Sequence, residues 1–188
     1  MPDLDAAKET LLAELREHSL VIGEVTLSSG ATAQYYVDAR RALMRPEGFR
    51  AAGALIAAVA HEVGAEAVGG PATAAIAPSC AALAVPAGDD LVAFFVRGEK
   101  KQHGLQRWVE GPVEAGVKAL IVEDTVTTGG STAKAVQRCR EEGLEIVGVI
   151  AVVDRLAGGA EKIEAAAEAP YRALVTIDEL YPERPDRG

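Results

Sequence analysis

A hydroxyl-rich loop with two glycines follows a pair of carboxylates in the segment ALIVEDTVTTGGSTAKAV, residues 119–136. Gly129 and Gly130 allow the backbone to turn sharply and to approach a ligand closely. A helix beginning near Ser131 would add free N–H groups and the positive end of its dipole. These features predict a phosphate-binding loop. The hydroxyl residues of the loop are Thr125, Thr127, Thr128 and Ser131. A plain helix cap with a turn is the alternative, and it needs only one Ser and one Gly.

The two carboxylates, Glu123 and Asp124, could bind a vicinal diol beside that loop. Neighbouring residues on a strand point to opposite faces, and we expect both acids to emerge into solvent where the strand ends. Carboxylates accept hydrogen bonds from hydroxyl groups. A ribose with its 5′-phosphate in the loop would bring its 2′- and 3′-hydroxyls within reach. Taken alone, the two acids fit equally well a strand that simply ends in water.

Three competing motifs are missing from the sequence. No G-x-x-x-x-G-K-[ST] occurs, which argues against a P-loop NTPase, and no G-x-G-x-x-G occurs, which argues against a dinucleotide-binding fold. The stretch GGSTA at 129–133 lacks the last Gly of a nucleophile elbow. A hydrolase of that kind also needs a His after the Ser, and the last His of the chain is His103.

Strands and helices alternate along the part of the chain that must position these groups. Apolar runs predict strands at 65–70, 91–96, 117–124, 145–154 and 171–177, with helices at 46–62 and 131–143 and an Ala-rich helix before 91. The N-terminal part predicts a helix at 4–17 and two short strands within 21–40. This order predicts an α/β fold with a mostly parallel sheet. Ligands bind beyond the carboxyl ends of such strands, where the acids and the loop lie.

The segment RGEKKQHGLQRWVEG, residues 97–111, interrupts that alternation. It is basic and shows neither a helical nor a strand period, so we expect a long loop. Long loops in compact domains are often functional, although a solvated surface segment is the alternative.

The composition limits the class of protein. A net charge of −9 over 188 residues argues against a general nucleic-acid-binding surface. Cys80 and Cys139 lie far apart, which suits a reduced, cytoplasmic protein, and the acidic start of the chain is unlike a signal peptide. Residues 67–88 carry no charge, but three prolines and many alanines argue against a membrane span.

The segment LIVEDTVTTGGST, residues 120–132, resembles the phosphoribosyl-pyrophosphate (PRPP) motif of type I phosphoribosyltransferases. Three further segments resemble the orotate-specific branch of this family. VTLSSGATAQYYVDAR (25–40) is similar to its N-terminal segment, RGEKKQHG (97–104) to its catalytic loop, and VVDR (152–155) to a strand end that supplies an Arg near orotate.

The resemblance implies a fold, a reaction and an assembly. The fold is the type I phosphoribosyltransferase fold, a single domain over 1–188 with a small N-terminal hood at about 1–45 and a core at about 46–180. The reaction converts orotate and PRPP to orotidine 5′-monophosphate and pyrophosphate in pyrimidine biosynthesis. Mg²⁺ is the implied cofactor, bound mainly through PRPP with no protein metal ligand. A homodimer that shares the 97–111 loop between subunits is also implied.

The resemblance also implies roles for individual residues. The catalytic group comprises Arg97, Lys101, His103 and Asp124. The PRPP-binding group comprises Glu123, Asp124, Thr125, Val126, Thr127, Thr128, Gly129, Gly130, Ser131, Arg97, Lys101 and His103. Thr127 and Arg155 are the implied orotate ligands, since a guanidinium matches a carboxylate. An ion pair of Arg155 with Asp154 or Glu161 is the alternative.

Departures from the family pattern and two other functions stay open. Gly98, Ser28 and Ala74 stand where many members have Lys, so fewer cations line the pyrophosphate side. A transferase acting on a purine base is one alternative, which the 27–40 segment and Arg155 disfavour. A PRPP-binding regulator that contacts nucleic acid is the other, and the net charge of −9 argues against it.

Overall fold

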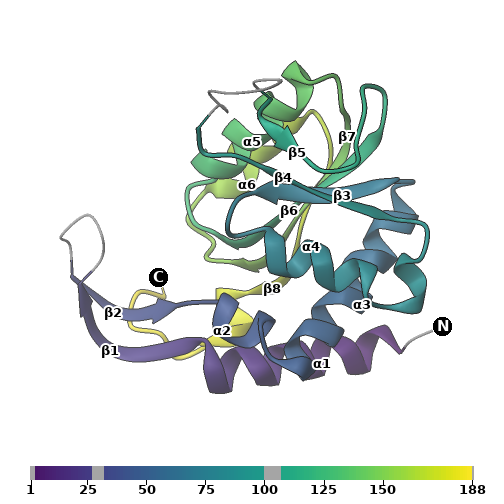
Figure 1. The fold of residues 1–188 in the computed structure, drawn as a ribbon. Helices are drawn as coiled ribbons and strands as arrows, with labels where there is room; N and C mark the ends of the chain where they lie inside the picture. Colours follow the sequence, from purple (N-terminus) through teal and green to yellow (C-terminus); the bar gives the residue numbers. More distant parts are fainter. Residues whose placement is uncertain (1–2, 27–31, 100–106, 188) are drawn as a thin grey trace.

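The computed structural model of the 188-residue chain describes residues 3–26, 32–99 and 107–187. Its centre is a six-stranded sheet with the strand order β5-β4-β3-β6-β7-β8 (Figure 1). The five strands from β4 to β8 along this order run parallel, and β5 pairs antiparallel with β4. The strand bounds are β3 Ala67–Pro71, β4 Val92–Val96, β5 Val109–Glu110, β6 Lys118–Val126, β7 Glu145–Asp154 and β8 Tyr171–Thr176. The prediction of an α/β fold with a mostly parallel sheet is confirmed.

Helices cover both faces of this sheet. On β6, Leu120 and Val122 belong to one buried cluster, and Ala119 and Ile121 belong to the other, because side chains alternate along a strand. The first face is covered by α1 (Leu4–His18), α3 (Pro46–Glu62) and α4 (Ile76–Leu83), and the second by α5 (Gly130–Glu141) and α6 (Gly159–Ala167). The central strands are therefore buried on both faces, which is why they are near-continuous apolar runs.

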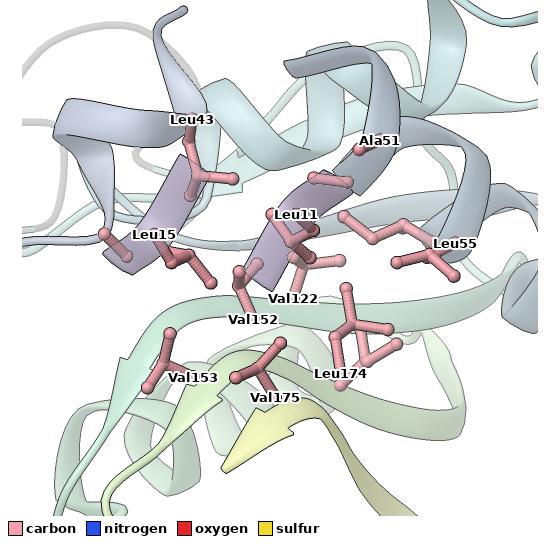
Figure 2. Packing of buried hydrophobic residues seen from close by; sticks show 14 of the residues in the cluster. Leu11, Leu15, Leu43, Ala51, Leu55, Val122, Val152, Val153, Leu174 and Val175 are labelled. Carbon is pink, nitrogen blue, oxygen red and sulfur yellow. The ribbon is translucent and has the colours of Figure 1, made fainter. Parts of the chain in front are cut away.

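The N-terminal region adds a hairpin and two helices beside the sheet. Strands β1 (Leu20–Thr26) and β2 (Thr32–Val37) pair antiparallel in a sheet of their own, and the short helix α2 (Arg40–Leu43) follows. Leu11 and Leu15 of α1 are fully buried against the first face of the sheet, near Val152 (Figure 2). Burying a Leu side chain stabilises by about 1.5–3 kcal/mol. Helix α1 therefore shares a core with the sheet, while the division into hood and core near residue 45 stays a prediction.

Some boundaries differ from the sequence-based expectation. Strand β6 runs two residues further than expected, because Thr125 and Val126 pair with β7. The 97–111 segment was expected to be a loop throughout, but Val109 and Glu110 form β5 by pairing with β4. Helix α6 was not predicted, nor were α2, the 3-10 turn η1 (Pro86–Gly88) and α7 (Ile177–Leu180).

The uncharged stretch 67–88 forms β3, a turn, α4 and η1. Across the described ranges, no helix has both the length and the apolar character that crossing a membrane requires.

Candidate active site

A cavity of about 340 Å³ lies at the carboxyl ends of β3, β6 and β7. This is where ligands bind in open α/β sheets. The N-terminal region supplies one wall and the strand ends supply the other. Its lining residues are Tyr36, Val37, Asp38, Ala39, Arg40, Thr73, Ala74, Asp124, Thr125, Thr127 and Arg155. Four of the predicted site residues, Asp124, Thr125, Thr127 and Arg155, therefore line one cavity and come from two separate parts of the chain.

The predicted phosphate loop is the turn from β6 into α5. Helix α5 begins at Gly130, and its N-cap is Gly129, which has a left-handed backbone at φ 69°. A Cβ on Gly129 would lie 2.7 Å from the carbonyl oxygen of Gly159. Only glycine fits there, because α6 packs directly against the turn. The N–H groups of the first turn of α5 have no acceptor within the helix and are free to bind an anion.

A lysine on α6 adds positive charge beside this turn. The ammonium nitrogen of Lys162 lies 3.6 Å from the point where a Cβ on Gly130 would be.

The predicted loop residues differ in exposure. Thr127 and Thr128 are at least partly exposed in the turn, whereas the side chain of Val126 is buried in the core. The carbonyl of Val126 accepts a hydrogen bond from the N–H of Arg155 at 2.9 Å. Any contact of Val126 with a ligand would therefore use its remaining backbone atoms.

The two carboxylates have different environments, and the expectation that both emerge into solvent is wrong. Glu123 is 3% exposed, because its side chain points toward the first turn of α5. Its carboxylate accepts hydrogen bonds from Thr132 Oγ1 at 2.8 Å and from Ser131 Oγ at 3.1 Å. Burial raises the pKa of Glu123 to about 7, against the opposing effect of the Thr132 hydrogen bond.

Asp124 is the carboxylate that lines the cavity. Burial raises the pKa of its carboxyl group, and the positive charge of Arg40 opposes that shift. Arg40 Nε donates to Asp38 Oδ1 at 2.8 Å and lies 3.8 Å from Asp124 Oδ2. The cavity thus presents two carboxylates held beside one guanidinium, an arrangement that can accept hydrogen bonds from sugar hydroxyls. Arg40 was not singled out from the sequence, although it ends the 25–40 segment.

Arg155 directly follows β7 and lines the cavity. Its guanidinium carbon lies 5.4 Å from the centre of the Tyr35 ring, and its Nε is buried with no hydrogen-bond partner among the described residues. The alternative of an ion pair with Asp154 or Glu161 is not formed within the described ranges. Asp154 instead accepts hydrogen bonds from Tyr171 Oη at 2.9 Å and Leu156 N at 2.8 Å. The Arg155 guanidinium is therefore available to an anionic ligand.

The basic segment is described only at its two ends. Arg97 Nη1 lies 3.4 Å from Glu110 Oε1, and Arg97 is not among the residues that line the cavity. Arg138 of α5 donates to the carbonyl of Gly98 at 2.8 Å and stacks on Trp108 at 3.9 Å, so it holds both ends of the segment. Lys101 and His103 lie outside the described residues, as does Ser28, and their predicted roles stay predictions.

Comparison with known proteins agrees with this fold and site. A family model described as the phosphoribosyl transferase domain matches residues 52–170. An orotate phosphoribosyltransferase from Streptomyces avermitilis is 45% identical over 179 residues, covering 94% of this chain and 98% of that protein.

Solved structures from Mycobacterium tuberculosis are also similar. Its orotate phosphoribosyltransferase in complex with Fe(III) dicitrate matches with a TM-score of 0.85 at 39% identity, covering 93% of this chain and 99% of that one. The same enzyme in complex with PRPP matches with a TM-score of 0.79 at 35% identity, covering 93% and 98%. The present chain belongs to the orotate phosphoribosyltransferase family.

Proposed function

We propose that this chain transfers the phosphoribosyl group of PRPP to orotate, giving orotidine 5′-monophosphate and pyrophosphate in pyrimidine biosynthesis. One observation carries the proposal: Asp124, Thr127 and Arg155 line a single cavity beside the glycine turn at the start of α5. The names of the similar proteins support it, and so does the PRPP complex of the M. tuberculosis enzyme.

The proposed placement of PRPP follows from the donors and acceptors in the cavity. The 5′-phosphate accepts hydrogen bonds from the N–H groups of the turn at 127–131, with Lys162 nearby. The ribose hydroxyls donate to Asp124. Glu123 contributes mainly by holding Ser131 and Thr132, because its carboxylate faces them. The pyrophosphate then lies toward Thr73 and Ala74 in the same cavity.

The base lies between this sugar and Arg155. The planar guanidinium matches the carboxylate of orotate, and Thr127 can hydrogen-bond a polar edge of the ring. In the reaction, the C1′–O bond to pyrophosphate breaks and its electron pair leaves with pyrophosphate. Orotate N1 forms the new bond to C1′, and the N1 proton is released to the solvent. The sugar is cationic in the transition state, so the nearby Asp124 carboxylate stabilises it.

Mg²⁺ is the proposed cofactor, carried into the site by PRPP. Within the described residues, no group of three or more His, Cys, Asp or Glu side chains could hold a metal ion, so the protein does not offer a complete cage there. Asp38 and Asp124 are oxygen donors that face the cavity and suit a hard cation already bound to phosphate. The ion supplies charge neutralisation for the leaving pyrophosphate. Arg97, Lys101 and His103 are proposed to add positive charge there, since Ala74 supplies none.

We propose a homodimer in which the 97–111 segment of one subunit reaches the other subunit's cavity. The position of Arg97 supports this sharing of the segment. Its side chain is paired with Glu110 and does not line the cavity of its own subunit. We also propose a cytoplasmic location, which fits the free thiols of Cys80 and Cys139.

Turnover of the added base tests the proposed function, and for orotate it is followed as a loss of orotate absorbance. Purified protein is mixed with PRPP, Mg²⁺ and one base at a time, namely orotate, adenine or hypoxanthine. We expect turnover with orotate and none with the purines. Turnover of a purine without turnover of orotate would replace the proposed function with that of a purine phosphoribosyltransferase.

A further inference from the structure

The C-terminal segment, residues 181–187, packs against Tyr35, whose ring lies next to the guanidinium of Arg155. In Figure 1 this segment (yellow, near the label C) runs beside β2. Tyr35 of β2 is 4% exposed, and its hydroxyl donates to Asp186 Oδ2 at 3.1 Å. The Tyr35 ring also meets the Tyr181 ring edge-on, with centroids 5.6 Å apart and planes at 81°. Two contacts from the C-terminal segment thus fix the Tyr35 ring.

Asp186 is itself held in place by the segment. Arg184 Nε lies 3.1 Å from Asp186 Oδ1, and Arg184 also pairs with Asp178 of α7. The side chain of Arg184 is 11% exposed and that of Asp186 is 58% exposed, so only the arginine side of this pair is shielded from water. Arg184 therefore helps to order the Asp186 carboxylate, which accepts the hydrogen bond from Tyr35.

Tyr35 in turn supports the guanidinium of Arg155. The Arg155 guanidinium carbon lies 5.4 Å from the Tyr35 ring centre, within cation–π range. Tyr35 does not line the cavity, whereas Arg155 does, so the ring lies behind the guanidinium. An Arg side chain loses conformational entropy when it is fixed. A ring that restricts Arg155 beforehand lowers the cost of binding an anion.

We infer that the C-terminal segment positions Arg155 for the carboxylate of the base, through the hydrogen bond between Tyr35 and Asp186. This inference rests on the proposed function. Tyr35 and Asp186 are positioning residues, since they act through Arg155. Both lie outside residues 52–170, which match the family model.

Steady-state kinetics of four single variants and one double variant test the inference. Asp186→Ala removes the acceptor, and Tyr35→Phe removes the donor but keeps the ring. We expect each to raise the KM for orotate by about 3- to 10-fold, with kcat and the KM for PRPP within about twofold of the wild type, because the bond to the Asp186 carboxylate is charge-assisted but acts on orotate only through Arg155. Asp186→Asn keeps an acceptor and should restore the wild-type KM. Glu183→Ala, which removes an exposed acid of the same segment, is the matched control.

The double variant Tyr35→Phe/Asp186→Ala should be no worse than either single variant, because both remove the same bond. An unchanged KM for orotate in both single variants would overturn the inference, as would equal increases in both KM values. The wild type is assayed first. If it fails to turn over orotate, the proposed function is wrong, and the role given to Arg155 and the C-terminal segment is wrong with it. If it turns over orotate but the variants do not change the KM, only the positioning role is wrong.

Discussion

Glu123 Oε2 accepts a hydrogen bond from Thr132 Oγ1 at 2.8 Å, and this bond joins the end of β6 to the first turn of α5. Thr132 is fully buried and Glu123 nearly so. The turn between them carries the N–H groups that we propose bind the 5′-phosphate. An acid that was predicted to bind the ribose hydroxyls thus holds in shape the turn that we propose binds the phosphate.

This burial predicts a pH-dependent stability. The pKa of Glu123 is about 7 in the folded protein and near 4.5 in the unfolded chain, so the folded state favours the protonated form. The corresponding stabilisation is complete below about pH 4.5 and is lost as pH rises through about 7, a change on the order of 3 kcal/mol. Glu123→Gln cannot ionise, and we expect its free energy of unfolding to fall less than that of the wild type over this range.

Urea unfolding at about pH 5 and about pH 8 measures the effect. Glu145→Gln removes an exposed carboxylate of β7 and is the control, which should show the same fall as the wild type. If the free energy of unfolding fell equally in the wild type and in Glu123→Gln between these two pH values, burial would impose no cost on the ionisation of Glu123.

Gly129 and Gly130 are expected to differ sharply in their tolerance of a side chain. Gly129→Ala places a Cβ 2.7 Å from the carbonyl oxygen of Gly159 and at a positive φ, so we expect a loss of about 2–3 kcal/mol in the free energy of unfolding and a higher KM for PRPP. In Gly130→Ala the nearest atom to the new Cβ is Lys162 Nζ at 3.6 Å, so stability should stay within about 1 kcal/mol of the wild type. Similar losses in both variants would contradict the tight contact between the turn and α6.

Arg155 should control the affinity for the base rather than that for PRPP. Arg155→Gln removes a charged donor facing the cavity, and we expect the KM for orotate to rise by about 10- to 100-fold. Arg172→Gln is the matched control, because Arg172 is paired with Glu62 and does not line the cavity. A larger rise in the KM for PRPP than in the KM for orotate would show that Arg155 binds PRPP rather than the base.

Lys101 should act mainly in the transition state. The resemblance assigns it to the leaving pyrophosphate, so we expect Lys101→Ala to lower kcat by about 10- to 100-fold while the affinity for orotate changes little. Lys134→Ala removes an exposed lysine of α5 as a control. An unchanged kcat in Lys101→Ala would refute the role.

The sequence predicted the parallel sheet because its strands are buried on both faces and read as apolar runs, as in 145–154. It placed Asp124 and the glycine loop at a ligand site because ligands bind beyond the carboxyl ends of such strands. Arg155 joined that site only through the family resemblance. The short helices were missed, since four residues such as Arg40–Leu43 carry no readable period. Helix α6 was missed, although its buried residues Ile163 and Ala167 are four positions apart, a spacing that places them on one face of a helix.

The missed features of the site depend on contacts between distant residues. No local pattern shows that Glu123 turns into the protein, because the hydroxyl partner Thr132 lies across a turn. The pairing of Arg40 with Asp124 and that of Tyr35 with Asp186 each join separate parts of the chain. Such contacts are set by tertiary packing, which residue types and spacing do not encode locally.

Product analysis tests the central claim most directly. The protein is incubated with orotate, PRPP and Mg²⁺, and orotidine 5′-monophosphate and pyrophosphate are quantified over time. We expect the two products to form in equal amounts and only when orotate is present. Release of pyrophosphate without orotidine 5′-monophosphate, or formation of a purine nucleotide in place of it, would contradict the function that we propose for this cavity.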